Sequence, residues 1–175
     1  MITDLRARRQ RGPSVGTLAG MAFDRPANLE ELLAQGRDGC VFCAVARGDS
    51  PAWVVHSDEH TLAFMDLLPM TRGHCLVIPR RHHDDIWDLD AETAGHVMEA
   101  ATIVAHKIRD TLRPAGLNLL NNNGRAADQS QFHFHIHVIP RYGRDRLLHP
   151  WERTFGDPAE IAAVADIING ARAEP

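Results

Sequence analysis

The segment from residue 129 to residue 140 constrains the fold of this chain more than any other, because three histidines alternate with apolar residues within it. It reads Gln-Ser-Gln-Phe-His-Phe-His-Ile-His-Val-Ile-Pro. Side chains two residues apart share one face of a β-strand, so a strand here would place His133, His135 and His137 on one face and apolar groups on the other. The β-branched and aromatic residues favour a strand over a helix, and Pro140 predicts its end.

Three interpretations of the histidine face compete. It could be the polar face of a half-exposed strand, although alternating histidines would contribute little packing there. It could hold a catalytic zinc ion, since imidazoles at i and i+2 of a strand can converge on one metal. It could supply a neutral imidazole as a nucleophile, because a reference pKa of about 6.5 leaves most of the ring unprotonated at pH 7.

Polar residues upstream of the histidines favour phosphoryl chemistry. Asn121, Asn122, Asn123 and Gly124 form a turn-prone run, and the pair 129–130, Gln and Ser, comes shortly before the first histidine. Amide and hydroxyl groups can donate hydrogen bonds to phosphate oxygens, whereas a plain metal site does not need them. We therefore expect the histidine face to act on a phosphate group, with Asn121 and Asn123 expected to do no more than form the turn.

The pattern His133-Phe-His135-Ile-His137-Val-Ile resembles the signature of the histidine triad (HIT) family of nucleotide hydrolases and transferases, and more closely its bacterial Hit-like and HINT-type branch. The resemblance runs from about Cys40 to Arg146. It implies an α+β fold, with a mainly antiparallel sheet of about five strands and one long helix packed on it. It also implies a homodimer and a purine nucleotide substrate.

The resemblance implies roles for individual residues. His135 matches the family nucleophile, which forms a covalent nucleotidyl-histidine intermediate, and His137 matches a residue that helps to bind the phosphate. Ser130 would hand a proton to a departing amine, and His74 matches a further histidine beside the triad. Contacts with the nucleotide are implied for Asp66 on the ribose, for Asn122, Gln129, Ser130 and His137 around the phosphate, and for Phe42, Phe64 and Leu67 around the base.

Cys40 and Cys43 form a Cys-x-x-Cys motif, which in a cytoplasmic protein indicates a redox pair or half of a zinc site. Zinc needs two more ligands, and His82 and His133 are available. Bacterial relatives that carry the cysteine pair imply a closed Cys₂His₂ site with structural zinc, and no metal is expected in the chemistry. Gln131 replaces a small apolar residue of many relatives and is expected to alter only the packing of its loop.

The remaining patterns predict five strands and two main helices. The strands are expected at 53–56, 61–65, 74–78, 117–121 and in the triad segment, with Cys75 as a small core residue. A short helix from Pro158 to Ile168 could bury its apolar side against this subunit or a dimer mate. A long helix is expected from Asp88 or Asp90 onward, with apolar positions at Val97, Met98, Ala101, Val104, Ala105, Ile108 and Leu112.

Length and composition indicate one domain with two extensions. We expect a mobile N-terminal extension at 1–36, which contains several arginines and a short helix at 28–35, then a HIT domain at 37–146 and a C-terminal tail at 147–175. The net charge of −4 gives no field for binding nucleic acid. No apolar run reaches the length of a membrane span, and three cysteines without a signal peptide indicate the cytoplasm.

Three classes of function follow. The first is an enzyme that releases a nucleoside monophosphate, AMP above all, from a phosphoramidate or phosphoanhydride through a His135 adduct, with a dinucleoside polyphosphate hydrolase or phosphorylase as the alternative. The second is a hydrolase whose three imidazoles hold a catalytic zinc. The third is a nucleotide-binding module with little turnover.

Overall fold

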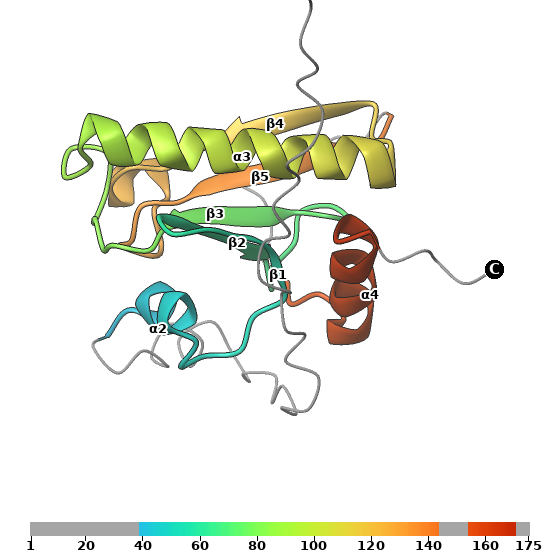
Figure 1. The fold of residues 1–175 in the computed structure, drawn as a ribbon, viewed down its shortest axis with the longest axis horizontal. Coiled ribbons are helices and arrows are strands. Elements are labelled where there is room, and N and C mark those ends of the chain that lie inside the picture. Colours follow the sequence, from blue (N-terminus) through green and yellow to red (C-terminus); the bar gives the residue numbers. More distant parts are fainter. Residues whose placement is uncertain (1–38, 144–153, 171–175) are drawn as a thin grey trace, which may run out of the picture.

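The structure is a computed structural model, and it describes residues 39–143 and 154–170. The expected N-terminal extension with its helix at 28–35 lies outside this range, as do residues 147–153 and 171–175 of the expected C-terminal tail. Within it, the chain folds into one five-stranded sheet with helices on both faces (Figure 1). The elements are α2 (Val41–Arg47), β1 (Val54–Ser57), β2 (Thr61–Met65), β3 (Cys75–Pro79), α3 (Ala91–Leu112), β4 (Gly116–Leu120), the 3₁₀ turn η1 (Arg125–Ala127), β5 (Ile136–Arg141) and α4 (Pro158–Ile168).

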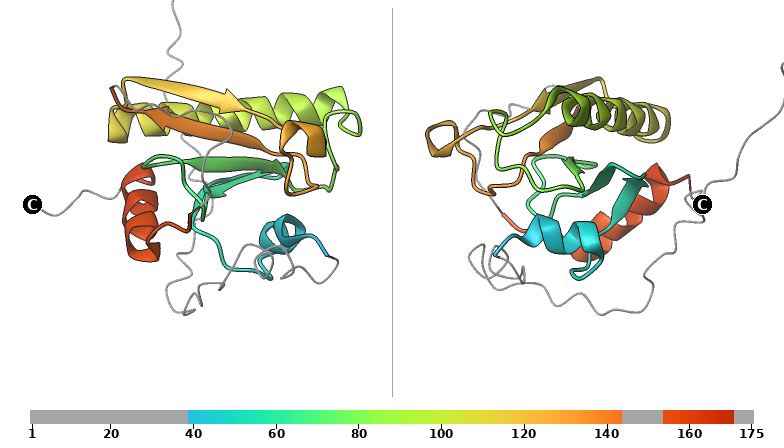
Figure 2. Two further views of the ribbon diagram at one scale, coloured as in Figure 1. Left: turned by 180° about the vertical axis from the view of Figure 1, so that it is seen from behind. Right: turned by 60° about the vertical axis from the view of Figure 1, so that its left-hand side comes forward.

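The sheet confirms the predicted α+β class. Its strand order is β1-β2-β3-β5-β4, and every neighbouring pair is antiparallel. The long crossover α3 lies between β3 and β4 in the chain and packs along one face of the sheet, while α2 lies on the opposite face (Figures 1 and 2). The helix at Val41–Arg47 was not predicted, because its seven residues are too few to show an amphipathic period.

Alternation along the strands divides the apolar residues between two cores. Cys75 and Val77 of β3 face the larger core under α3, and Leu76 and Ile78 face a smaller core under α2. The prediction that Cys75 is a small core residue is therefore confirmed. Because His137 pairs with Leu76 across the ladder, the triad imidazole of β5 points to the α2 face.

Helix α3 follows most of the predicted stripe, although Ala105 and Leu112 are only partly buried and Met98 is exposed. Asp90 is its N-cap, since its side chain accepts the Thr93 N–H at 2.7 Å. Met98 was expected in the stripe, but its side chain is 48% exposed. The buried stripe consists of Val97, Ala100, Ala101, Val104 and Ile108, and Met98 lies one position off its edge.

Helix α4 resolves an alternative that the sequence leaves open. Asp157 caps the helix and Pro158 opens it, as the pattern predicts. The buried residues of α4 pack in the larger core of this same subunit and not against a dimer mate; they are Ile161, Val164, Ala165 and Ile168. Among the described residues, no helix is both long enough and apolar enough to cross a membrane.

Strand β5 extends to Arg141, one residue past the proline that was expected to end it. Pro140 lies within β5 and pairs with Leu117. Ala115 N–H donates to the Arg141 carbonyl, so the backbone groups of Arg141 face β4 and those of Pro140 face the other side. The neighbour on that other side is β3, and its pairing with β5 ends at Val138. Pro140 lies beyond this last pair, so its missing N–H costs no hydrogen bond of the sheet.

Candidate active site and metal centre

The triad segment is only partly a strand. β5 begins at Ile136, so His133 and His135 precede it, and the prediction of one strand through all three histidines is wrong at its start. The reason is that Phe134 N–H donates to the His83 carbonyl at 2.6 Å instead of joining a ladder. The predicted division of faces nevertheless holds: Phe134, Ile136 and Val138 enter the larger core, and the three imidazoles are buried away from it.

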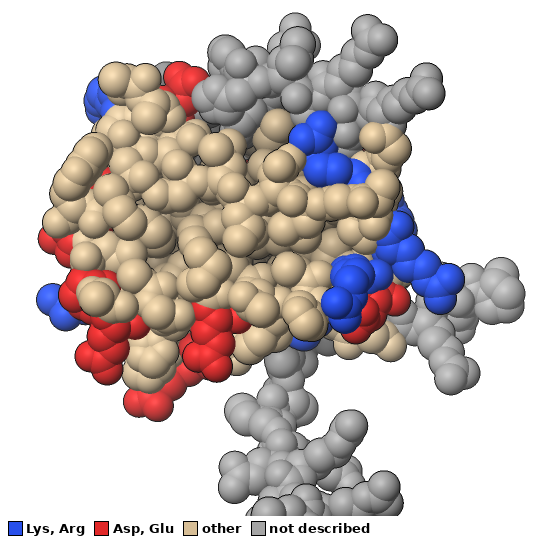
Figure 3. Space-filling model, turned by 90° about the horizontal axis from the view of Figure 1, so that it is seen from above, with Lys and Arg blue, Asp and Glu red and all other residues tan. Residues whose placement is uncertain are grey.

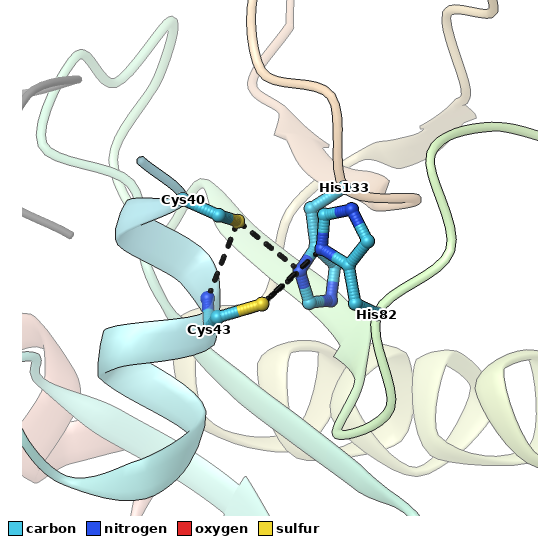
Figure 4. Close-up of side chains that lie close together, drawn as sticks. All are labelled: Cys40, Cys43, His82 and His133. Carbon is cyan, nitrogen blue, oxygen red and sulfur yellow. Dashed lines mark hydrogen bonds between the residues drawn. The ribbon is translucent and has the colours of Figure 1, made fainter. Parts of the chain in front are cut away.

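Four side chains converge where the sequence predicts a zinc site: Cys40, Cys43, His82 and His133 (Figure 4). Nδ1 of His133 lies 3.5 Å from the sulfur of Cys40 and 3.5 Å from that of Cys43, and Nδ1 of His82 lies 3.2 Å from the Cys43 sulfur. With zinc bonds of about 2.3 Å to sulfur and about 2.0 Å to nitrogen, neighbouring ligands of a tetrahedron are roughly 3.5 Å apart. The donor set and its spacing therefore fit a tetrahedral zinc ion.

Both histidines of this cluster are oriented by an acceptor on their second ring nitrogen. Nε2 of His133 donates to the Pro79 carbonyl at 2.9 Å, and Nε2 of His82 lies 2.8 Å from an oxygen of Asp84. In each ring the Nδ1 lone pair is thereby turned toward the sulfurs, which is the usual arrangement of histidine ligands. Burial holds the pKa of His133 at about 4, so the ring is neutral and able to bind metal at pH 7.

Helix α2 explains how the cysteine pair reaches the histidines. Cys40 is the N-cap, and its sulfur accepts the Cys43 N–H at 3.4 Å, so the first turn of the helix points both thiols the same way. Gln131 donates a further N–H to the Cys40 sulfur at 3.4 Å. The expectation that Gln131 only alters packing missed this contact, which the sequence separation of 91 residues conceals.

His135 is held as one tautomer. Its Nδ1 lies 2.7 Å from the backbone carbonyl of His133, and a carbonyl can only accept, so Nδ1 carries the proton. Nε2 is therefore the ring atom with the lone pair. The ring is 4% exposed, and Phe42 of α2 packs edge-on against it at 5.3 Å between ring centres. An imidazole in this state can act as a nucleophile at neutral pH.

His137 is oriented by the buried His74. The Met70 N–H donates to Nδ1 of His74 at 3.1 Å, so the proton of His74 is on Nε2 and points to Nδ1 of His137, 2.9 Å away. His137 then carries its own proton on Nε2, as a donor suited to a phosphate oxygen. Burial, with a smaller contribution from His135, lowers the pKa of His74 to about 3, so His74 stays neutral.

Asp66, His74 and His137 also lie close enough together to resemble a metal site. However, the Met70 N–H leaves His74 no lone pair on Nε2, the atom that faces the group. The three side chains are therefore better described as a hydrogen-bonded chain. Asp66 places one oxygen 3.5 Å from Nε2 of His74 and uses the other to accept the Leu68 N–H at 2.8 Å.

The polar residues of the loop after β4 differ in burial and in whether their side chains are already hydrogen-bonded. Both oxygen and nitrogen of the Gln129 amide are engaged within the protein, with Gly124, Asp84 and Gln131. Asn122 is 7% exposed, and its side chain makes no hydrogen bond with the described residues. Ser130 is exposed. Of the expected phosphate contacts in this loop, Asn122 and Ser130 thus keep side chains available to a ligand.

The three expected base-binding residues are divided between the two cores. Phe42 and Phe64 contact each other edge-on at 5.5 Å on the α2 face. Leu67 packs against the larger core instead. Asn121, expected to be a turn residue only, donates its amide to the His135 carbonyl at 2.8 Å. No local pattern distinguishes Asn121 from its neighbours, so only the fold reveals this contact.

The triad imidazoles do not share one ligand set. Among the described residues, His133 belongs to the cysteine cluster, His137 to the Asp66 chain, and His135 to neither. The arrangement therefore gives no support to a catalytic zinc held by all three.

Comparisons with known proteins agree with this geometry. The family model of the HIT domain matches residues 47–144. Protein hit of Bacillus subtilis is 47% identical over 107 residues, which cover 61% of this chain and 74% of that protein. The adenylylsulfatase HINT3 of Arabidopsis thaliana is 35% identical over 111 residues, covering 63% of this chain and 56% of that protein.

Solved structures show the same fold. A zinc-bound histidine triad family protein from Mycobacterium smegmatis is 36% identical with a TM-score of 0.69, covering 78% of this chain and 94% of that chain. A HIT family member from Bacillus subtilis is 40% identical with a TM-score of 0.60, covering 78% of this chain and 99% of that chain. With the family model over more than half of its length and the triad in place, the chain belongs to the histidine triad family.

Proposed function

We propose that this protein is a nucleotide hydrolase or transferase that releases a purine nucleoside monophosphate, AMP above all, through a covalent intermediate on His135. The observation that carries the proposal is the tautomer of His135, because its Nδ1–H donates to the His133 carbonyl and its Nε2 keeps the lone pair. His137 beside it presents an Nε2–H to the same reaction centre, with ring centres 4.9 Å apart.

The reaction proceeds in two displacements. Nε2 of His135 attacks the phosphorus as the bond to the leaving group breaks, and Nδ1–H shares the new positive charge with the His133 carbonyl. Nε2–H of His137 and the amide of Asn122 stabilise the charge on the non-bridging oxygens. The leaving group takes up a proton, from the Ser130 hydroxyl where it is an amine. Water then attacks phosphorus, and its proton restores the Ser130 hydroxyl where that hydroxyl gave one up. The P–N bond breaks, the nucleotide leaves, and His135 returns to its neutral Nδ1–H form.

The nucleotide outside the phosphate would contact two further regions. We assign the ribose hydroxyls to Asp66, whose second oxygen has no backbone N–H bonded to it. We assign the base to Phe42 and Phe64 on the α2 face and not to Leu67, because Leu67 packs against the larger core. A bound zinc would hold α2 and His133 together and supply stability, and its thiolate ligands favour a reducing compartment such as the cytoplasm.

The first experiment measures AMP release from adenosine 5′-phosphoramidate and diadenosine tetraphosphate, by the native protein and by His135→Ala, with and without a chelator. The proposal expects release that His135→Ala abolishes and a chelator leaves nearly unchanged. Mass spectrometry of native protein quenched in alkaline denaturant should detect an adenylyl adduct on His135, because the P–N bond of such an adduct is stable in base and labile in acid. Activity that survives His135→Ala would refute the proposal, and tight AMP binding without product would favour a binding module.

The leaving group separates the candidate substrates. Preference for the phosphoramidate would indicate a phosphoramidase, and preference for the tetraphosphate would indicate the dinucleoside polyphosphate alternative. The similarity to a protein named adenylylsulfatase motivates a third substrate, adenosine 5′-phosphosulfate. Sulfate leaves without needing a proton, so its release should be insensitive to Ser130→Ala, whereas release of an amine should slow.

We further propose a homodimer through the surface formed by α3 and β4. Figure 3 looks down on this side of the molecule, where a broad face without charges is bordered by acidic residues on one edge and basic residues on the other. Met98, Ile103 and Leu119 are exposed large apolar residues on these two elements, and β4 is an edge strand. A two-fold axis would extend the sheet and bring acidic and basic edges together. Leu119→Lys should lower the mass in solution from dimer to monomer, measured by light scattering, and Asp166→Lys on the exposed side of α4 should not.

A further inference from the structure

We propose that Asn121 is a positioning residue for the nucleophile, and that Asn123 and the segment 82–86 hold its amide in the required orientation. The inference rests on the proposed function, since it concerns how His135 is set in place for attack. It starts from the contact of Asn121 with the backbone of His135, which none of the expected roles includes.

The contact lies where regular strand pairing stops. β4 and β5 pair as far as Leu120 and His137, and β4 ends there. Immediately beyond, the side-chain Nδ2 of Asn121 donates to the His135 carbonyl at 2.8 Å. The amide therefore takes the place of the next backbone hydrogen bond, at the residue that carries the nucleophile and that no longer belongs to a strand.

The orientation of this amide is determined by its partners. The Ile86 N–H donates to Oδ1 of Asn123 at 2.8 Å, and a backbone N–H can only donate. Asn123 consequently presents Nδ2 to Oδ1 of Asn121. Asn121 is left with Nδ2 toward the His135 carbonyl. A flipped amide at either position would bring two acceptors or two donors together. Each group in the series from Ile86 through Asn123 and Asn121 therefore donates to the next, ending at the His135 carbonyl.

The segment 82–86 anchors the start of this chain. His82 faces the cysteine cluster, the His83 carbonyl accepts the Phe134 N–H at 2.6 Å, and the Asp84 carbonyl accepts the Gln129 amide at 2.7 Å. Ile86 then orients Asn123. Successive residues of one short segment thus contact the metal centre, the triad segment and the loop after β4. His135 is held from both sides, through its ring by His133 and through its carbonyl by Asn121.

This geometry separates Asn121 from its neighbour Asn122. The Asn121 amide is fully engaged within the protein, whereas the buried Asn122 side chain makes no hydrogen bond with the described residues. Loss of Asn121 should therefore lower kcat and leave KM nearly unchanged. Loss of Asn122 should also affect binding of the nucleotide.

The decisive variant is Asn121→Asp, which keeps the shape and the acceptor for Asn123 but turns an oxygen toward the His135 carbonyl. We expect kcat to fall by about 10- to 100-fold, the range that a small misplacement of reacting groups can cost. We expect KM to stay within about twofold, because substrate contacts remain. The ¹⁵N resonances of the His135 ring should move from the pure Nδ1–H tautomer toward a mixture.

The matched control is Asn169→Asp. Nδ2 of Asn169 donates to the Val54 carbonyl at 2.9 Å, so it makes the same kind of bond, at β1, the opposite edge of the sheet. It should change neither kcat nor the His135 resonances. Native kcat and native ring resonances in Asn121→Asp would overturn the inference, and so would an equal effect of the control.

A second variant covers the case in which Asn121→Asp does not fold. Asn123→Asp keeps the acceptor for Ile86 but removes the donor to Asn121, and it should lower kcat by about 3- to 10-fold with the same change of ring resonances. An unchanged spectrum would contradict the relay. If the native protein releases no AMP from any substrate, the proposed function fails, while the resonances still decide whether Asn121 positions His135.

Discussion

His133 and His135 are two residues apart in one buried segment, yet their rings are oriented in opposite ways. His133 gives its Nε2–H to the Pro79 carbonyl and turns Nδ1 toward two sulfurs. His135 gives its Nδ1–H to a carbonyl and keeps the lone pair on Nε2. The comparison shows that the ring atom bonded to a carbonyl decides which nitrogen keeps a lone pair, Nδ1 in His133 and Nε2 in His135.

The two ends of the segment are also connected. The carbonyl that orients the His135 ring belongs to His133, the residue whose ring faces the cysteine cluster. A metal at that cluster would fix the His133 ring and, through the same residue, help to fix the acceptor of His135. We therefore expect substitution of His135 to affect mainly the reaction rate, and substitution in the cysteine cluster to affect mainly the stability.

The largest effect should come from removing the nucleophile. His135→Ala is expected to lower kcat/KM for AMP release by about 10⁴- to 10⁶-fold, in the range found for other essential nucleophiles. The melting temperature should change little, because the ring contributes no bond to the metal cluster. Steady-state assays on both candidate substrates test this, with substitution of the exposed His106 by alanine as the control. Comparable losses of kcat/KM in the two variants would contradict the assignment of His135 as the nucleophile.

The opposite pattern is expected from the metal end. Cys40→Ser should lower the free energy of unfolding by about 3 kcal/mol, the stabilisation given by a ligand present at several hundred times its Kd, while kcat falls less than about tenfold. Chemical denaturation with and without a chelator measures the first quantity. Cys75→Ser is the control variant, because it changes a thiol of the larger core that is not part of the cysteine cluster. If Cys40→Ser lowered kcat as much as His135→Ala does, the cysteine cluster would be needed for the reaction as well as for stability.

The sequence alone predicted most of this comparison and failed at identifiable places. Period-two alternation and helical spacing located the strands, α3 and α4, because a strand or long helix shows its period within its own residues. The grouping of Cys40, Cys43, His82 and His133 followed from a family pattern. Helix α2 was missed because seven residues show no amphipathic period. The contacts of Gln131 with Cys40 and of Asn121 with His135 were missed because only the fold brings these residues together.

A pH titration of stability sharpens the contrast between the two ends. His74 has a pKa of about 3 in the folded protein, and an unfolded chain protonates it near 6.5. The unfolded state therefore binds more protons below pH 6.5, and stability should fall as the pH falls, by about 1.4 kcal/mol per pH unit from this group. His74→Asn should remove that slope between about pH 6 and pH 4.

The metal end should add to the same slope while a metal is bound, because the unfolded chain protonates His133 near 6.5 and a metal-bound ring cannot be protonated at Nδ1. The metal-free ring has a pKa lowered to about 4 by burial, so after chelation it takes up a proton in the folded protein too. Chelation should thus remove the contribution of this ring to the slope below about pH 4. Unfolding curves at successive pH values decide this, and a slope that is independent of chelator would contradict the assignment of His133 as a ligand.

The smallest effect should come from Asn122. Asn122→Ala removes one donor near the phosphate, and we expect kcat/KM to fall by about tenfold, with weaker AMP binding. Asn122→Asp should be worse than Asn122→Ala, because its charge repels the phosphate. Isothermal titration with AMP separates binding from turnover, and AMP affinity equal to that of the native protein in both variants would exclude Asn122 from the site.

The separation of Cys40 from His133 by 93 residues has a consequence for how the protein is made. During synthesis the two thiols leave the ribosome well before either histidine ligand, and α2 is too short to be stable by itself. A metal captured early would be held by the two sulfurs and then by His82 until the triad segment arrives. Completing its coordination would then close a loop that spans most of the domain, as a cross-link does. The nucleophile would reach its final place only at that last step of assembly.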